Sequence, residues 1–390
     1  MDSTYNIRNF CYNFYIYFVI LAFLYPRGFS EYIPEYKKFF VIMIACATVL
    51  ICIQCLIHIT KNCILKFRFR YLPFIGYFFM VFVISCIIKN DFLNGKQQIF
   101  LYPILCLFIF LNFKNKPEKF LKSLSNILLV LFLANMIIFT DYFAEHVHIT
   151  FLGHIQIISQ LGILSVFSNT LLYIITNKQK IRRIFFIIFT LFIMFTTDTD
   201  SAVLSGVILL IGIIIYKSKL YYLLCLKSQW YVFVMFYFST FIIYLTVNNI
   251  LIKINLVFEF SGRNFVWRAA LDKFFQSPII GYGIEGVLLE TFWSEWVGIG
   301  FNYAHNQIMQ TLLDGGSILL VIYFIMLLAC ASSINMIFNK EYKILANICL
   351  ITFLFVSIFD SVSSYCYVFI FLSIIISIPD IAKNNDIFKI

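Results

Sequence analysis

Charged residues are scarce in this sequence. Of 390 residues only 12% are Asp, Glu, Lys or Arg, whereas 62% are hydrophobic, and the mean hydropathy is +0.92. A soluble domain is about half apolar and about a quarter charged, so this composition excludes a water-soluble globular protein. The sequence therefore predicts an all-α, polytopic integral membrane protein in which residues 1–390 form a single membrane domain.

The formal net charge of +10 does not come from one basic domain. Lys and Arg fall in short clusters between apolar runs, which is typical of loops on the cytoplasmic side of a membrane. The charge therefore gives no indication of a nucleic-acid partner, and the lipid bilayer is the expected partner.

About twelve apolar runs are candidates for membrane-spanning helices. The runs fall at about 12–25, 39–59, 72–88, 99–113, 124–140, 155–175, 184–197, 201–216, 230–250, 317–337, 344–358 and 365–378. When the intervening loops are assigned alternately to two sides, one side holds 20 of the 29 Lys and Arg residues and the other holds 9. The positive-inside rule places the richer side, and both termini, in the cytoplasm. No secretory cleavage site follows the first run, so it is expected to be retained as a span.

The opposite side carries one long segment, residues 251–316, and no cysteine lies in it. The cysteines of loops and tails all fall on the predicted cytoplasmic side, where thiols stay reduced: Cys11, Cys63 and Cys225. Cys52 and Cys55 have a redox or metal spacing, but they lie in an apolar run without His partners, so packed thiols are expected. A long loop in a compact protein is usually functional or disordered. The segment is not low-complexity, so short amphipathic helices packed on the spans, and the candidate active site, are predicted there.

Arg263 is the first candidate site residue in this segment. A helix is expected between Ser261, near its N-cap, and Pro278, past its end. At the helical period Arg263 shares an apolar face with Trp267 and Phe274. A guanidinium there is suited to phosphate oxygens, and the alternatives are snorkelling to the membrane interface or a pair with the preceding carboxylate, Glu259.

Arg268 points away from that face. It is expected either to pair with Asp272 at i, i+4 or to contact the same substrate as Arg263.

His305 and Asn306 lie close to the end of the long segment. If residues 301–316 form a helix, His305 shares a face with Ile308, Met309 and Leu312. A lone histidine on an apolar face is often a hydrogen-bonded core residue. Here it follows an external loop and precedes a span, so a neutral imidazole there can accept a proton from a hydroxyl, with Asn306 beside it in contact with substrate.

Two other polar clusters compete with this site. His146, His148 and His154 share one external loop, but no cysteine or well-spaced carboxylate completes a metal site, which favours a wet interfacial loop. Asp198 and Asp200 can form a cation site or an acid–base pair, but a turn that caps the next span is favoured. No metal or cofactor is predicted.

The order and spacing of the motifs in the long segment resemble a known family. Arg263-x-x-x-Trp267, Pro278-x-x-Gly281-x-Gly283 and His305-Asn306 with Gly315 are similar to the large external-loop signature of the O-antigen polymerase and O-antigen ligase superfamily. The resemblance covers the whole chain in architecture and about residues 261–316 in sequence. It implies an all-helical enzyme of the bacterial inner membrane that transfers glycans, with residues 251–316 in the periplasm.

The resemblance also implies roles for particular residues. Arg263 and Arg268 would face the pyrophosphate of an undecaprenyl-linked oligosaccharide, and His305 would contact or activate the acceptor hydroxyl. Family members tend to carry a Ser-Arg pair at the start of a middle span, where this chain reads Asp200-Ser201-Ala202. Whether Arg27 or another residue supplies that second phosphate contact is left open.

The expected function is that of an O-antigen polymerase. Such an enzyme transfers the growing glycan from undecaprenyl pyrophosphate to a hydroxyl of another lipid-linked repeat unit, and a chain-length regulator protein is a further expected partner. The alternatives are an O-antigen ligase, whose acceptor is lipid A-core, and a lipid-linked oligosaccharide flippase. The spans are nearly free of Lys and Arg and one external segment is long, which favours an enzyme over a transporter.

Overall fold

The computed structural model describes most of the chain, and helices dominate it. The described residues are 3–60, 69–91, 95–138, 149–176, 178–197, 199–248, 250, 262–291, 300–337 and 339–384. Within them the only strands are the two-residue β1 and β2, which pair antiparallel. The predicted all-α class is confirmed.

Almost all of the named elements are helices. Their bounds are α1 (Ser3–Phe23), α2 (Arg27–Tyr32), α3 (Glu35–Thr60), η1 (Phe69–Tyr71), α4 (Leu72–Phe82), η2 (Val83–Ile88), η3 (Gln97–Leu101), α5 (Tyr102–Asn115), α6 (Pro117–Ile138), β1 (Ile149–Thr150), β2 (Gly153–His154), α7 (Ile157–Thr176), α8 (Lys180–Thr196), α9 (Asp200–Lys217), η5 (Lys219–Cys225), α10 (Ser228–Val247), α12 (Arg263–Gln276), α14 (Gln307–Asn335), α15 (Lys340–Phe359), η6 (Val362–Ser364) and α16 (Cys366–Asn384).

Every predicted apolar run falls on a helix, but fewer helices than runs qualify as spans. In the described part of the chain eight helices are long and apolar enough to cross a membrane, or nine if the bent pair α9 and η5 counts as one span. The apolar parts of α1 and α16 are shorter, Phe10–Phe23 and Cys366–Ile381. Helix α8 has 17 residues and begins with three cations, Lys180, Arg182 and Arg183. The polytopic architecture is thus confirmed, whereas fewer than the predicted twelve or so spans qualify within the described residues.

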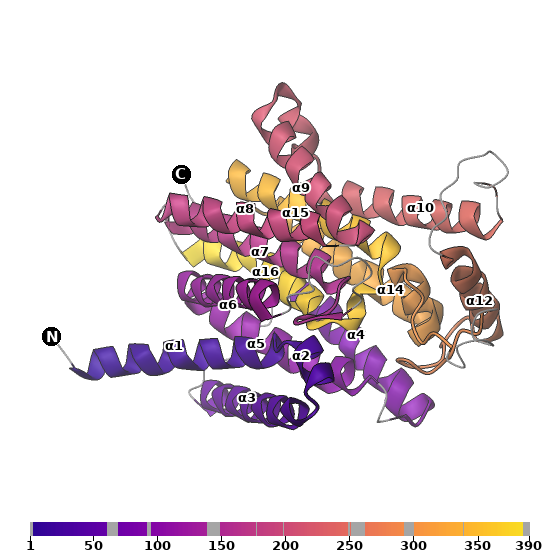
Figure 1. The fold of residues 1–390 in the computed structure, drawn as a ribbon, viewed down its shortest axis with the longest axis horizontal. Helices are drawn as coiled ribbons and strands as arrows, with labels where there is room; N and C mark the ends of the chain where they lie inside the picture. Colours follow the sequence, from indigo (N-terminus) through magenta and orange to yellow (C-terminus); the bar gives the residue numbers. More distant parts are fainter. Residues whose placement is uncertain are drawn as a thin grey trace.

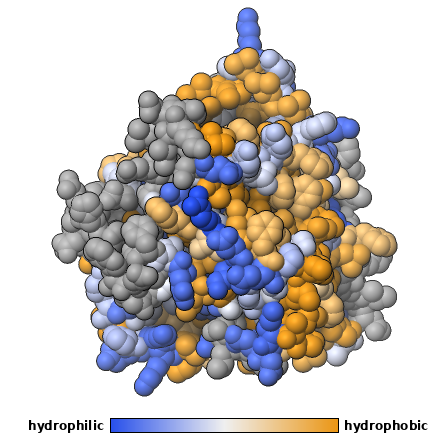
Figure 2. Space-filling model, turned by 90° about the vertical axis from the view of Figure 1, so that its right-hand side faces the viewer, coloured by the Kyte–Doolittle hydropathy of each residue, from blue (hydrophilic) through white to orange (hydrophobic). Residues whose placement is uncertain are grey.

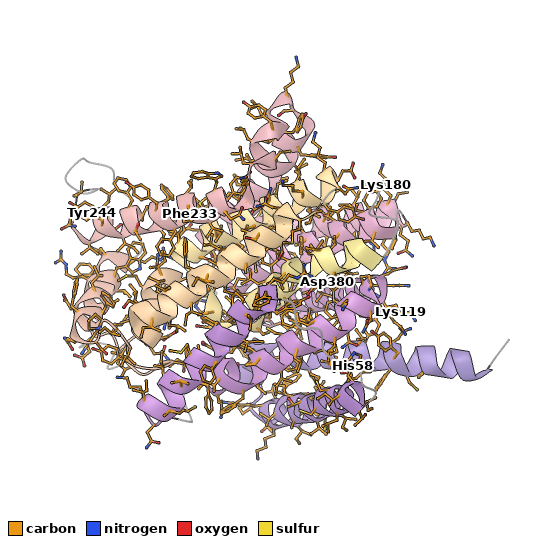
Figure 3. The ribbon with its side chains drawn as sticks, turned by 180° about the vertical axis from the view of Figure 1, so that it is seen from behind. His58, Lys119, Lys180, Phe233, Tyr244 and Asp380 are labelled. Carbon is orange, nitrogen blue, oxygen red and sulfur yellow. The ribbon has the colours of Figure 1, made fainter. Side chains whose placement is uncertain are left out.

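The helices are arranged so that the two ends of the molecule differ. Helix α12 lies at the right-hand end of Figure 1, and both chain termini lie toward the left. Figure 2 looks onto the right-hand end, where hydrophilic side chains gather across the centre and along the lower edge. Figure 3 shows Lys119 and Lys180 at the end opposite Tyr244. The Lys-rich loops before α6 and α8 therefore share one end, and α12 lies at the other.

Helices α16 and α3 show how hydrophobicity is distributed around the bundle. From Cys366 to Ile381, α16 is buried at almost every position, and it packs against α5, α14 and α7. Helix α3 is equally apolar, yet only 17% of its span is buried and side chains such as Val41 and Leu56 are exposed. A helix that is apolar on all sides suits either a protein core or lipid, so α16 forms the centre and α3 faces outward.

Helix α14 is broken inside its apolar run. Gly315 (φ −150°, ψ 17°) and Gly316 (φ 62°, ψ −162°) leave the helical region. A Cβ on Gly316 would lie 2.3 Å from the carbonyl carbon of Ile279, so only glycine fits there. The break frees backbone groups that lipid cannot satisfy, so protein groups must pair with them.

Residues 278–283 supply those partners. Leu313 and Asp314 end the first half of α14. The Leu313 carbonyl accepts the N–H of Tyr282 at 2.7 Å, and the Asp314 carbonyl accepts the N–H of Gly283 at 2.9 Å. The Pro278 carbonyl accepts from the N–H of Ser317 at 2.9 Å, which begins the second half. The glycine motifs that suggested a family therefore form one packed unit with a structural role.

Candidate active site

A polar cavity of about 400 Å³ lies among α2, η3, the β2–α7 connection, the segment before α14 and the connection from α15 to α16. Its lining is rich in amides and hydroxyls, and it contains six acidic or basic side chains: Arg27, Lys96, His154, Glu285, His305 and Asp360. Polar cavities with several ionisable groups are the default candidates for an active site, and ionisable groups in a membrane protein are candidates for function.

His305 lies just before α14 and not on it. The helix begins at Gln307 with Asn306 as its N-cap, and His305 adopts a left-handed φ of 51°. The helical face that His305 was predicted to share with residues 308–312 is therefore wrong, because a residue before the N-cap lies outside the helical period. A positive φ in a residue other than glycine is uncommon and often marks a functional site.

The His305 ring is enclosed by polar and aromatic groups. The ring centroid of Tyr303 is 4.4 Å away, and Nε2 of Gln156 is 3.4 Å from Nδ1 of His305. Burial, together with the positive charges of Arg263 and His154, lowers the pKa of His305 to about 3. The imidazole is therefore neutral near pH 7 and able to accept a proton.

Asn306 is fully buried and its amide is used by protein groups. Its Oδ1 accepts the N–H of Met309 at 3.0 Å, and its Nδ2 donates to the Ile358 carbonyl at 2.8 Å and to the Ser239 hydroxyl at 3.2 Å. These bonds tie the start of α14 to α15 and α10, and so they fix the residue next to His305. A substrate contact for Asn306 stays a prediction, and it would require one of these bonds to be exchanged.

Arg263 begins α12, and the face predicted for it is largely confirmed. Trp267 is completely buried, and its Nε1 donates to the Ala304 carbonyl at 2.9 Å. The guanidinium carbon of Arg263 is 6.0 Å from the ring centroid of Phe359, and its Nε is buried without a hydrogen-bond partner among the described residues. Burial lowers the pKa of Arg263, and the carboxylates of Asp360 and then Asp200 act against that shift. The alternative partner at position 259 lies outside the described residues.

Asp360 faces Arg263 but does not touch it. The carboxylate is 3% exposed, and within the described ranges neither oxygen has a hydrogen-bond partner or an ion pair. Burial raises the pKa of Asp360 to about 7, although the Arg263 guanidinium and the Ser201 hydroxyl favour the charged form. Asp360 therefore titrates near physiological pH. The sequence offered no signal for it, because a carboxylate directly after an apolar run is ordinary.

Arg27 lies in the cavity wall. Its Nη2 donates to Gln97 Oε1 at 2.8 Å and to the Tyr102 hydroxyl at 3.2 Å, and its guanidinium carbon is 5.2 Å from the Tyr365 ring centroid. No carboxylate of the described residues pairs with it within 4.0 Å. Glu285, elsewhere in the lining, has a pKa that burial raises and that Arg27 holds down. Arg27 is thus a cation in the cavity wall whose side-chain contacts among the described residues are with neutral groups.

Arg268 lies apart from this group. It is exposed, and its Nη2 donates to the carbonyl of Val247 at 2.8 Å, at the end of α10. The predicted pair with Asp272 is not formed, because the guanidinium is directed toward that carbonyl. The structure therefore brings Arg27, and not Arg268, into the cavity with His305.

The competing clusters contribute one residue to the cavity. His146, His148 and Asp198 lie outside the described residues, whereas His154 lines the cavity. Asp200 lies in the first turn of α9, but the N-cap is Thr199 and no side-chain cap bond is made there, so the predicted cap is not observed. In the part of the chain that the structure describes, no group of three or more His, Cys, Asp or Glu residues is placed to hold a metal ion.

Comparison with known proteins agrees with the resemblance drawn from the loop motifs. Residues 184–324 match the model of a family described as O-antigen ligase, and this range contains Arg263, Arg268, His305 and Asn306. A Rickettsia conorii protein that carries the name of a polysaccharide ligase is 22% identical over 139 residues, which are 32% of this chain and 33% of that protein. The chain thus matches about a third of the length of this relative. The resemblance to the O-antigen polymerase and ligase superfamily is confirmed over the matched segment.

Proposed function

We propose that this chain, which resembles the O-antigen polymerase and ligase superfamily, transfers a glycan from a lipid pyrophosphate to an acceptor hydroxyl. The specific activity proposed is that of an O-antigen polymerase on the periplasmic side of a bacterial inner membrane. One observation carries the proposal: a neutral imidazole, His305, shares a polar cavity with Asp360 and lies within the field of Arg263, in a protein made of membrane-spanning helices.

The guanidinium groups are assigned to the leaving group. In the proposed step the acceptor oxygen attacks the anomeric carbon, the bond from that carbon to the phosphate oxygen breaks, and the electron pair leaves with the pyrophosphate. Arg263, at the start of α12, stabilises this developing charge. Arg27 supplies a second guanidinium from the cavity wall, and Arg268 is reached only by a substrate that extends outside the cavity.

The acceptor proton is assigned to His305. Part of the reason for the low pKa of its imidazole is the charge of Arg263, and a bound pyrophosphate offsets that charge. Donor binding therefore raises the pKa of His305 and makes it a stronger base when the acceptor hydroxyl is present. Asp360, with a pKa of about 7, is the second group that can receive the proton.

The surface polysaccharide of a deletion strain tests the polymerase assignment against the ligase. Loss of a polymerase leaves lipid A-core that carries a single repeat unit, whereas loss of a ligase leaves bare core. The name of the Rickettsia conorii relative favours the ligase, so bare core would move the assignment to that activity. A polymerase is also expected to work with a chain-length regulator protein, so overproduction of the regulator should shift the length of the polymer.

Reconstitution separates the enzyme from a flippase. Purified protein in liposomes should lengthen glycan on lipid-linked units presented only from outside. Movement of those units across the bilayer without any lengthening would support the flippase.

The proposed sidedness has its own test. A cysteine introduced at the exposed Glu290 should react with an impermeant probe from outside the membrane, and one introduced at the exposed Lys180 should react only after permeabilisation. Labelling of position 180 from outside would place the cavity on the wrong side for this function.

A further inference from the structure

The first half of α14 carries a buried polar stripe that the reaction proposed above does not use. Gln307, Gln310, Thr311 and Asp314 recur at the i, i+3, i+4 and i+7 spacing of one helical face, and each is at most 4% exposed. The stripe ends directly before the break at Gly315. Polar groups inside a span are costly unless they are hydrogen-bonded, so a stripe of this kind indicates a role.

The amide of Gln310 is bonded at both ends. Its Oε1 accepts the backbone N–H of Ala304 at 2.8 Å and the Ser361 hydroxyl at 3.3 Å, and its Nε2 donates to Asp314 Oδ1 at 2.9 Å. A backbone N–H can only donate, and a carboxylate accepts. These partners therefore fix the orientation of the amide.

These bonds join the two segments that carry the proposed proton acceptors. Ala304 directly precedes His305, and Ser361 directly follows Asp360. Gln310 itself lines the cavity with both of them. One amide thus connects the backbone next to His305 with the residue next to Asp360.

Asp314 anchors this connection at the helix break. Its carboxylate accepts from Gln310 and also faces the backbone amide of Glu285, a third ionisable residue of the cavity lining. Its own carbonyl accepts the N–H of Gly283 at 2.9 Å. The break in α14 therefore leaves Asp314 in contact with both the helix and the segment that crosses it.

We propose that Gln310 and Asp314 are positioning residues, which hold His305 and Asp360 at a fixed separation across the cavity. The inference rests on the proposed function, because it concerns the geometry of the same reaction. It assigns no contact between Gln310 and the reacting atoms.

Gln307 provides a matched control on the same face. It is equally buried, and its amide accepts the N–H of Ser363 at 2.8 Å and donates to the hydroxyls of Ser363 and Thr311, both at 3.0 Å. It makes as many bonds as Gln310, but none to a neighbour of His305 or Asp360. Gln307→Leu should therefore measure the cost of losing a buried glutamine without moving the proposed acid–base pair.

The kinetic experiment compares these variants in the full-length protein in liposomes with lipid-linked repeat units. Gln310→Leu is expected to lower kcat about 10- to 100-fold with KM changed less than about threefold, since a small misplacement of catalytic groups can cost that much. Gln307→Leu should keep kcat within about threefold of the wild type.

Gln310→Glu places two carboxylates side by side and should be impaired, whereas Gln310→Glu with Asp314→Asn restores a donor–acceptor pair and should recover activity. Equal losses for Gln307→Leu and Gln310→Leu, or no recovery in the double variant, would overturn the inference.

A second readout does not depend on turnover. Diethyl pyrocarbonate acylates neutral imidazole, and the rate of modification at His305 can be followed by peptide mass spectrometry. Gln310→Leu should speed this modification several-fold while Gln307→Leu leaves it unchanged. Identical rates in the wild type and both variants would overturn the positioning role. If the wild type transfers no glycan, the proposed function fails, and the labelling still decides whether Gln310 positions His305.

Discussion

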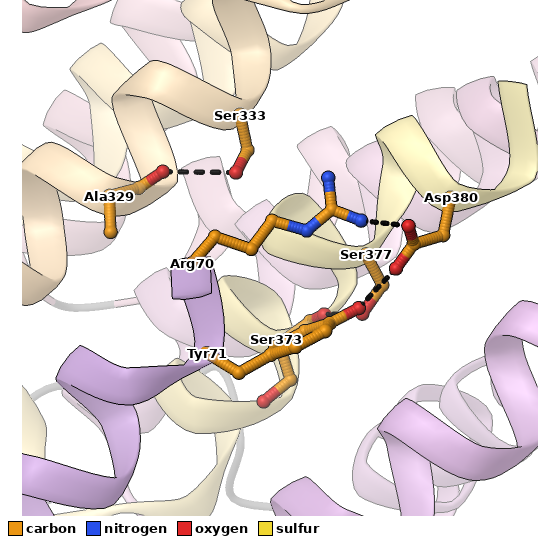
Figure 4. A network of polar contacts seen from close by, with 7 residues as sticks. All are labelled: Arg70, Tyr71, Ala329, Ser333, Ser373, Ser377 and Asp380. Carbon is orange, nitrogen blue, oxygen red and sulfur yellow. Dashed lines mark hydrogen bonds and ion pairs between the residues drawn. The ribbon is translucent and has the colours of Figure 1, made fainter. Parts of the chain in front are cut away.

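Two buried arginine–aspartate arrangements lie near opposite ends of α16, and they differ in whether the charges meet. Arg70 and Asp380 form a direct ion pair, and the Tyr71 hydroxyl donates to the other carboxylate oxygen (Figure 4). Both charged side chains are enclosed, at 11% and 2% exposure. At the other end of α16, which is about 20 Å long between Cys366 and Asp380, Asp360 has no such partner among the described residues, and Arg263 acts on it without an ion pair.

The difference separates a closed charge pair from an open one, which under the proposed function would be completed by substrate. A buried pair in contact is already compensated, and this one joins η1, directly before α4, to the end of α16. Asp360 lines the cavity and Arg263 lies behind that lining, so in the proposed reaction a bound pyrophosphate and an acceptor hydroxyl would supply the missing partners. Variants that alter each pair separately should therefore affect different properties.

The largest effect is expected from removing one member of the closed pair. Asp380→Ala leaves the Arg70 charge buried without its partner, which typically costs about 3–5 kcal/mol and should sharply reduce the amount of folded protein in the membrane. Asp360→Asn removes no ion pair among the described residues and keeps the shape of the side chain, so membrane levels should stay near those of the wild type while glycan transfer falls. Quantitative blots of membranes, read beside polymer yield, test both. Normal levels of Asp380→Ala would show that the two pairs do not differ in this way.

Arg263 is expected to give the largest effect on the reaction itself. Losing a charge-assisted contact of about 2–4 kcal/mol corresponds to a loss of about 30- to 1000-fold in rate. Arg263→Lys should fail nearly as badly as Arg263→Ala, because one ammonium does not reproduce a two-pronged guanidinium. The measurement is the rate of transfer in liposomes, with levels checked by blot. Wild-type rates from Arg263→Ala would remove the leaving-group role.

The pH dependence of stability should reveal His305 and Asp360 as opposing groups. The pKa of His305 is about 3 in the folded state, below its ordinary value near 6.5, so acidification below about pH 6.5 favours the unfolded state. The pKa of Asp360 is about 7, above its ordinary value near 3.8, so acidification from pH 7 to 4 favours the folded state. Each slope is at most about 1.4 kcal/mol per pH unit, and the two largely cancel between pH 4 and 6.5.

Single variants should separate these two contributions. Relative to the wild type, Asp360→Asn should lose stability as the pH falls, and His305→Gln should gain it. Thermal unfolding midpoints of the detergent-solubilised protein between pH 4 and 7 provide the measurement. Parallel curves for all three proteins would contradict both pKa shifts.

The sequence predicted the architecture better than the local geometry of the site. Apolar runs locate the helices because removing their side chains from water, into the protein core or the bilayer, dominates the free energy of folding. The faces of α12 follow from the helical period. The position of His305 could not be predicted in this way. The helix begins only at Gln307, with Asn306 as its N-cap, so the helical period does not extend to His305.

Asp360 and the Arg27 side of the cavity depend on tertiary packing. Arg27 reaches the cavity because α2 is held on the β1–β2 hairpin, with Arg27 N–H donating to the Leu152 carbonyl at 3.2 Å. A contact over such a distance in sequence leaves no local pattern. The long-segment glycines were recognised correctly as a motif, but their role in satisfying the break at Gly315 was visible only in the folded chain.

The smallest effect is expected at Arg268. Its guanidinium is exposed and donates to the carbonyl of Val247, so it contributes to how α12 packs on α10 and not to the cavity. Arg268→Lys keeps a donor that can reach a carbonyl, and transfer rates should stay within about threefold of the wild type. Asp272→Ala should be silent, because the i, i+4 pair that would have linked the two residues is not formed. The same liposome assay, run beside Arg263→Lys at equal protein levels, makes the comparison. If Arg268→Lys lowers the transfer rate as much as Arg263→Lys does, the glycan donor extends from the cavity across the exposed face of α12. Both guanidinium groups would then bind it.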